Sequence, residues 1–185
     1  MSEVVAVRTA TGIGPLRRVV AWAVGLGLAA GGLAIAATRD VAAIEAIRLL
    51  VALGMLAWVA MVDVQTLRAP NVIVLPTFVF SASAAFASGP EHGLLALAGG
   101  GLALSVLAGL AIVSRGTMGM GDVKVGAISG TLVGAAGVVP LLFATFLAAG
   151  AVAAVALVLR IRSRKDVIAL TPFIALGTLV ALGWQ

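Results

Sequence analysis

Long apolar runs follow one another along almost the whole chain, and they limit its fold more than any other feature. Of the 185 residues, 62% are hydrophobic and only 10% are charged. A soluble domain is nearer about 45–50% apolar and about 25% charged. Several of the runs reach about 20 residues, the length that a helix needs to cross a bilayer. The composition therefore predicts an all-α, polytopic membrane protein.

The spacing of the runs predicts seven transmembrane helices, at about residues 16–37, 43–62, 70–88, 93–114, 122–137, 141–161 and 167–183. Pro70 is predicted to open the third helix, because proline is tolerated in a first turn. Turns are predicted at Gly89-Pro90-Glu91-His92 and near Val138-Val139-Pro140. We divide the chain into residues 1–42, an N-terminal tail with the first helix, and residues 43–185, a six-helix core.

The first apolar run has two interpretations. Its Gly27 and Gly31 form a GxxxG pair that suits close packing against a neighbouring helix. We therefore interpret the run as a retained transmembrane helix. The alternative is a cleaved signal peptide, since Ala34-Ile35-Ala36 resembles a small-residue cleavage site.

The positive charges predict an orientation in the membrane. A net charge of +5 would suggest nucleic acid in a soluble protein, but here the basic residues cluster in loops, so no nucleic-acid partner is expected. With seven spans, one set of loops holds Arg8, Arg17, Arg18, Arg68, Arg115, Lys124, Arg160, Arg162, Arg164 and Lys165, and the other holds Arg39 and Arg48. The positive-inside rule then puts the N-terminus in the cytoplasm and the C-terminus outside. Asp63, Asp122 and Pro172 fall at cytoplasmic helix ends.

A charged pair at the start of the second predicted helix receives no function. Glu45 and Arg48 lie one turn apart and can pair there. We interpret them as a solvated helix end.

Two aspartates at predicted helix ends are the candidates for chemistry. Asp122 lies in Gly119-Met120-Gly121-Asp122-Val123-Lys124, between two apolar runs, and Asp63 ends an earlier run. An acid at the edge of the hydrocarbon is expensive, and the adjacent glycines let another backbone approach. Two carboxylates held close share a proton, so one can act as a base on water while the other donates to a carbonyl oxygen. We expect the two acids to form one site.

The remaining composition is in keeping with a site that needs neither metal nor cofactor. The chain has no cysteine and a single histidine, His92. Zinc–thiolate sites, disulfides and cysteine nucleophiles are therefore excluded, as is a metal site built from several histidines.

Glycine spacing suggests how the helices of the two acids could meet. Asp122, Gly126, Gly130 and Gly134 recur every four residues and form one row on a helix, and a glycine row lets another helix approach. The stretch from Asp122 to Gly137 would rise about 24 Å, short of the roughly 30 Å hydrocarbon core. We expect Asp122 to lie slightly below the headgroups, in a water-accessible dip.

Three motifs in this order resemble those of the GxGD aspartyl proteases, specifically the prepilin peptidase family. Gly119-Met120-Gly121-Asp122 matches the GxGD signature, and Val123-Lys124 matches its usual continuation. Asp63 with Arg68, Pro70 and Asn71 resembles the first-aspartate motif, D-x4-R-x-P-N. The segment that contains Thr171-Pro172-Phe173 resembles the C-terminal proline–phenylalanine motif. The likeness covers about residues 43–183.

The resemblance implies a function and a role for each motif. It implies cleavage of the leader peptides of type IV or Tad-type prepilins, or of pilin-like precursors, at the cytoplasmic face of the bacterial plasma membrane. Asp63 and Asp122 would be the catalytic pair. The other residues would shape the site or bind substrate: Gly119, Gly121, Lys124, Arg68, Pro70, Asn71, Pro172 and Phe173. Lys124 would tune the pair or extend towards the headgroups.

The chain departs from the larger members of that family. It lacks the cysteine tetrad of their N-terminal methyltransferase domain, and it resembles the short form. Two alternatives remain: an ion- or proton-coupled transporter in which the acids are carriers, and a catalytically idle assembly factor of a pilus or secretion machine. Cleavage that needs both acids would distinguish the peptidase from either.

Overall fold

The computed structural model describes residues 15–38, 43–66, 71–114, 118–159 and 169–185. These residues form six helices and no strand: α1 Pro15–Thr38, α2 Ala43–Thr66, α3 Asn71–Ala87, α4 Pro90–Val113, α5 Met120–Val158 and α6 Thr171–Trp184. The all-helical prediction is confirmed for this part of the chain.

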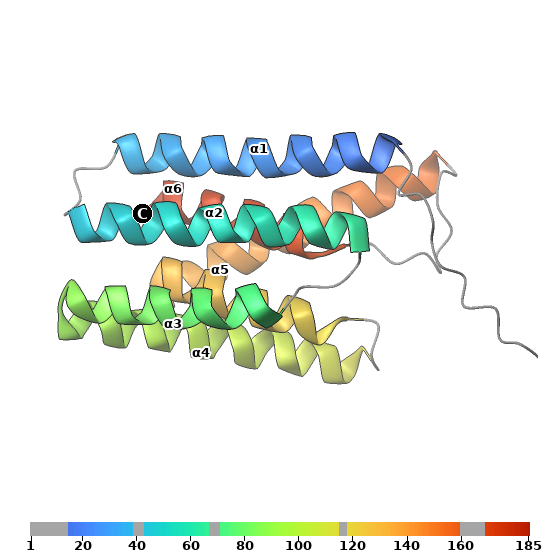
Figure 1. The fold of residues 1–185 in the computed structure, drawn as a ribbon. Coiled ribbons are helices and arrows are strands. Elements are labelled where there is room, and N and C mark those ends of the chain that lie inside the picture. Colours follow the sequence, from blue (N-terminus) through green and yellow to red (C-terminus); the bar gives the residue numbers. More distant parts are fainter. Residues whose placement is uncertain (1–14, 39–42, 67–70, 115–117, 160–168) are drawn as a thin grey trace, which may run out of the picture.

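The helices run between two ends of a bundle (Figure 1). We call one end the Thr171 end; it gathers the ends of α2 and α4 and the beginnings of α3, α5 and α6. We call the other the Gly134 end; it holds the beginning of α2, the connection from α3 to α4 and the last turn of α6.

Helix α5 is broken at Gly134, where the backbone takes φ 65° and ψ 177°. A straight helix of its 39 residues would reach about 58 Å. Instead, a first arm (residues 120–133) and a second arm (residues 135–158) diverge at the break, and the outer ends of both arms lie towards the Thr171 end (Figure 1). The two arms correspond to the fifth and sixth predicted helices.

The predicted turn at Val138-Val139-Pro140 is wrong, because these residues are helical. Proline keeps a helical φ and lacks only the N–H donor, so Pro140 lies inside the second arm. The conformation at Gly134 is open to almost no residue except glycine, and the chain therefore reverses there.

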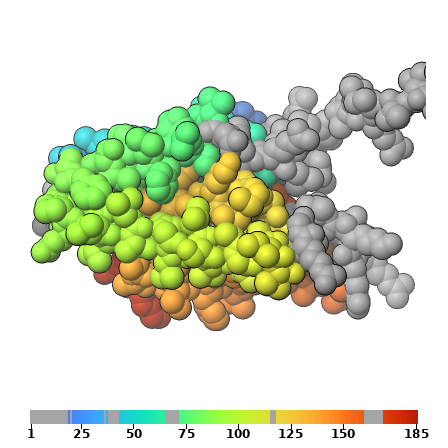
Figure 2. All heavy atoms as spheres, turned by 90° about the horizontal axis from the view of Figure 1, so that it is seen from below, coloured from blue at the N-terminus to red at the C-terminus, as the bar shows by residue number. Residues whose placement is uncertain are grey.

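Glycines bring α4 against the first arm of α5. A Cβ atom at Gly130 would overlap the carbonyl oxygen of Gly99, and one at Gly99 would overlap that of Gly130. A Cβ at Gly126 would overlap the side chain of Leu107. The predicted glycine row does admit a neighbouring helix, but that helix is α4 and not α2, which carries Asp63. Figure 2, which shows the molecule of Figure 1 from below, has α3 and α4 side by side on that face.

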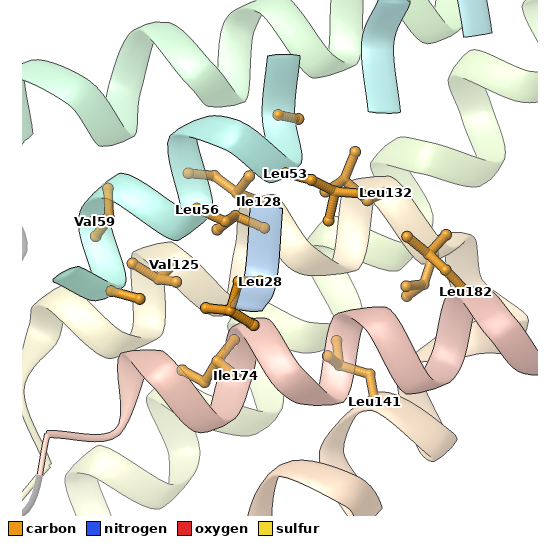
Figure 3. Close-up of a cluster of buried hydrophobic side chains, with 14 of the residues drawn as sticks. Leu28, Leu53, Leu56, Val59, Val125, Ile128, Leu132, Leu141, Ile174 and Leu182 are labelled. Carbon is orange, nitrogen blue, oxygen red and sulfur yellow. The ribbon is translucent and has the colours of Figure 1, made fainter. Parts of the chain in front are cut away.

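The second arm of α5 packs against α6 through another glycine. A Cβ at Gly177 would overlap Leu141 and Thr145 of that arm. The largest apolar cluster lies between α2, α5 and α6 and includes Leu56, Ile128 and Ile174 (Figure 3). Helix α6 thus fills the space between α2 and the arms of α5.

Helix α1 lies along α2, but not through the pair of glycines expected. A Cβ at Gly32 would meet Leu53 of α2 at 3.0 Å, and one at Gly31 would meet Leu179 of α6 at 2.9 Å. A Cβ at Gly27 would meet nothing within 4 Å. The GxxxG motif therefore contributes Gly31 and not Gly27 to close packing.

Two predicted helix ends also move. Pro90, Glu91 and His92 form the first turn of α4 and not a separate turn, because proline is accepted at the first helical position. Helix α6 begins at Thr171, whereas the sequence predicted about residue 167; Ala169 and Leu170 are not helical. Residues 167 and 168 lie outside the described part.

The surface is that of a membrane protein. By length and composition, three described helices could cross a bilayer, within 43–64, 90–113 and 120–158, and three shorter ones are apolar. Large apolar side chains are exposed along them, among them Leu94, Ile112, Phe143 and Val155. Soluble monomers rarely expose such continuous apolar surface, so these faces are suited to lipid.

Candidate active site

Two carboxylates meet at the Thr171 end of the bundle. Asp63 lies in the last turns of α2 and is 5% exposed. Asp122 lies in the first turn of α5 and is half-buried. A carboxylate in a first helical turn interacts favourably with the positive end of the helix dipole. The two charges are close enough to interact electrostatically.

Thr171, the first residue of α6, joins the two acids. Its Oγ1 donates a hydrogen bond of 3.1 Å to Asp122 Oδ1. Its hydroxyl and its backbone N–H also lie close enough to the carboxyl group of Asp63 to interact with it. At this helix end the N–H of Phe173 is bonded to the carbonyl of Leu170, and Pro172 has no N–H. The N–H of Thr171 is therefore the one next to the carboxyl group of Asp63.

The two acids differ in what else holds them. The backbone of Gly119 lies beside the Asp122 carboxyl group: a Cβ at Gly119 would be 3.5 Å from Asp122 Oδ2, and the N–H of Gly119 interacts with that group. Asp63 Oδ2 is buried and has no hydrogen-bond partner among the described residues. Burying a carboxyl oxygen without a hydrogen-bond partner is costly. Asp63 Oδ2 is therefore available to accept a hydrogen bond from a water molecule or to carry a proton.

The structure brings several other predicted site residues to the same end. Gly119 precedes α5 with an extended backbone (φ −74°, ψ 142°) that does not require glycine, and Gly121 lies in the first turn. Lys124 is half-buried one turn further along α5. Pro172 and Phe173 form the first turn of α6 and are half-buried.

The first-aspartate motif is only partly described. Arg68 and Pro70 lie outside the described residues, so the predicted start of the third helix at Pro70 lies there too. Asn71 is the first described residue of α3, and its side chain is outside the description.

Thr171 is a site residue that sequence reasoning missed. The resemblance points to Pro172 and Phe173 of this motif, and not to the threonine before them, as the functional residues. The available signal was a hydroxyl directly before Pro172, at the start of an apolar helix.

A second polar cluster lies at the Gly134 end and corrects the interpretation of Glu45 and Arg48. The predicted pair exists, with Arg48 Nη1 3.4 Å from Glu45 Oε2, but Arg48 is 5% exposed and not solvated. Its Nη2 donates to the carbonyls of Thr131 and Leu132, at 3.1 and 3.2 Å. Gln185 Nε2 donates to the carbonyl of Val133 at 2.7 Å.

These contacts explain how the break in α5 is tolerated. The last carbonyls of a helix have no partner within it, and inside a membrane each needs another donor. Arg48 and Gln185 supply donors to the carbonyls of residues 131–133. The cluster therefore caps the end of the first arm of α5. It lies away from the two aspartates.

The fold and the paired acids define an all-helical membrane protein with a two-carboxylate site. Comparison with protein families then identifies the group: the sequence profile of the type IV leader peptidase family matches residues 50–155, more than half of the chain. The chain belongs to this family, the prepilin peptidases, and so to a family of proteases. Neither a curated protein nor a solved structure matches it.

Proposed function

We propose that this chain is a membrane aspartic endopeptidase that removes the leader peptides of type IV or Tad-type prepilins, or of pilin-like proteins. The observation that carries the proposal is the meeting of Asp63 and Asp122 at one end of the bundle, bridged by Thr171. Membership of the type IV leader peptidase family supports the substrate class.

The paired carboxyl groups suit peptide hydrolysis by activated water. One carboxylate takes a proton from a water molecule, and the resulting hydroxide attacks the scissile carbonyl carbon. The partner acid donates its proton to the carbonyl oxygen. When the C–N bond breaks, the acid that took the proton from water passes it to the leaving amine. The partner recovers its own proton from a hydroxyl of the tetrahedral intermediate, and the pair regains its starting state. The unpartnered Asp63 Oδ2 offers an oxygen for these transfers.

The alternation of helical segments supports seven crossings of the membrane. Counted with the two arms of α5, seven segments run in turn from one end of the bundle to the other (Figure 1). Arg48 no longer counts as a loop charge, because its side chain is buried, so only Arg39 remains in the smaller set. The positive-inside rule then favours a cytoplasmic Thr171 end. This is the face of the membrane at which the resemblance implies cleavage of the leader peptide.

The test is a cleavage assay in membranes with a prepilin encoded in the same genome. Wild type, Asp63→Asn and Asp122→Asn are compared by mobility shift and N-terminal sequencing of the product. Each variant is expected to lose at least about 100-fold in rate, because general acid–base groups contribute about 10²–10⁴-fold. Glu91→Gln is the control, since Glu91 is an exposed acid at the Gly134 end, and it should cleave like wild type.

Each other outcome has a defined meaning. Normal cleavage by either aspartate variant would show that this acid is not catalytic. If wild type leaves several candidate prepilins intact, the peptidase proposal fails, and a transporter or an idle assembly factor becomes the better interpretation.

A further inference from the structure

We infer that Thr171 is a positioning residue of the active site: it holds the carboxyl groups of Asp63 and Asp122 together in the arrangement that reacts. This inference rests on the proposed peptidase function. It assigns a role to a residue outside the segment that matches the family profile, residues 50–155.

The packing of the helices makes such a residue necessary. The glycine row that begins at Asp122 faces α4, as Gly126 and Gly130 show. Asp63 comes from α2, which therefore does not lie in that close helix–helix contact. Among the described residues, Thr171, at the start of α6, lies between both acids.

The other buried threonines each donate to a carbonyl of their own helix, and Thr171 does not. Thr77, Thr145 and Thr178 donate to the carbonyl four residues earlier, at 2.7, 2.8 and 2.8 Å. Thr131 donates to the carbonyl three residues earlier, at 2.7 Å, and its oxygen also lies 3.0 Å from Ser81 Oγ. Thr171 is the first residue of α6, so no helical turn precedes it to accept its proton. Its side chain is fully buried, and its hydroxyl reaches the acids of two other helices.

The hydroxyl also matches the protonation that the mechanism needs. A threonine hydroxyl has one proton to donate and two lone pairs that accept. Between two ionised carboxylates it could satisfy only one of them. Between a carboxylate and a protonated acid it donates to the first and accepts from the second. The backbone N–H of Thr171 can donate to the carboxyl group of Asp63 in either state, so it holds that group in place without deciding which acid carries the proton. The single proton of the hydroxyl is what favours a pair that carries one proton.

The experiment compares Thr171→Ser with Thr171→Ala in the full-length protein, using the prepilin cleavage assay. Both variants lack the γ-methyl group and differ by one oxygen, so their ratio isolates the hydroxyl. We expect kcat of Thr171→Ala to fall about 10- to 100-fold, the value of a hydrogen bond to a charged group, with KM changed less than about threefold. Thr171→Ser should keep at least about a third of the wild-type kcat.

Two further variants guard the interpretation. Thr171→Val keeps the shape of threonine without the hydroxyl and should be as slow as Thr171→Ala; if it does not accumulate, the Ser/Ala ratio still decides. Thr178→Val makes the same change two turns later in α6, at a hydroxyl that bonds only its own helix among the bonds described. It should cleave within about threefold of wild type.

The results separate this inference from the proposed function. If wild type cleaves and the aspartate variants do not, but Thr171→Ala equals Thr171→Ser, the positioning role is wrong and the peptidase stands. A rise in KM at constant kcat would also overturn it, because it would place Thr171 in substrate binding. If wild type does not cleave, both proposals fall together.

Discussion

The guanidinium group of Arg48 lies inside the bundle, where an unpaired charge would cost several kcal/mol. It contacts Glu45 on its own helix and two carbonyls at the end of the first arm of α5. A charged residue within a membrane segment is usually a functional candidate. Here the backbone break at Gly134 accounts for it.

Replacing Arg48 should therefore affect stability. In Arg48→Met, Glu45 remains as a half-buried acid without its partner and two carbonyls lose their donor, which costs about 3 kcal/mol, the lower end of the range for breaking a buried pair. The melting temperature of the purified protein in detergent should fall by about 10 °C. The double variant Glu45→Gln, Arg48→Met should recover part of the loss, because the unpaired charge is removed. Arg48→Met melting like wild type would rule out the capping role.

Single residues could be predicted from the sequence where their importance depends on their own chemistry and not on what faces them in the fold. Two acids next to apolar runs are expensive wherever they fall, so Asp63 and Asp122 could be singled out. Thr171 could not, because a hydroxyl beside a proline is common and its value depends on what faces it. The burial of Arg48 depends likewise on the break in another helix, 86 positions away at Gly134 in the printed sequence.

The helices show that the glycines of α4 divide between a packed and an open face. Gly99 lies against the backbone of α5, whereas a Cβ at Gly101 would meet nothing within 4 Å. The two residues stand in the same helix and are both far from its ends. They form a matched pair for testing the contact.

Gly99→Ala should destabilise the protein by about 1–3 kcal/mol, because the new Cβ meets backbone atoms and α4 must move away. Gly101→Ala should be neutral or stabilising by up to about 1 kcal/mol, since alanine favours a helix. The melting temperatures of both variants in one detergent measure the difference. Equal values would mean that α4 and the first arm of α5 do not meet at Gly99.

The elements themselves were largely predictable, but their breaks were not. Apolar runs mark helices in a membrane protein, and each described helix overlaps one of them, or two in the case of α5, with ends that differ by a few residues. The turn in α5 was placed at Pro140 because proline is the stronger local signal. Several glycines in that region could adopt a positive φ, and only packing against α4, α2 and α6 selects Gly134.

Across the described part of the molecule, the polar cluster at the Thr171 end and the one at the Gly134 end lie at opposite ends of the bundle. Asp63, Asp122 and Thr171 lie at one end, and Glu45, Arg48 and Gln185 lie at the other. That the chain is a series of apolar helices could be predicted from the sequence. The neighbours of each segment could not, because lipid-facing and buried apolar residues look alike in a sequence.

Labelling with an impermeant thiol reagent tests the orientation, because the chain has no cysteine of its own. Each of two variants places one thiol at an exposed position. His92→Cys lies in the first turn of α4, and Met120→Cys lies at the start of α5, after the connection that follows α4. In intact cells His92→Cys should react and Met120→Cys should react only after the membrane is permeabilised. The reverse pattern would invert the topology, and labelling of both from one side would mean that α4 does not cross.

The break at Gly134 also bears on how the chain is made. As α5 emerges from the ribosome it can enter the membrane as a hairpin, with its bend ahead of both arms. Arg48 has by then been synthesised and can reach the carbonyls of Thr131 and Leu132, but Gln185 follows α5 in the chain. Val133 therefore gains its donor only once α6 has been inserted. The same helix brings Thr171 to the acids, so α6, which is synthesised last, supplies contacts at both ends of the bundle.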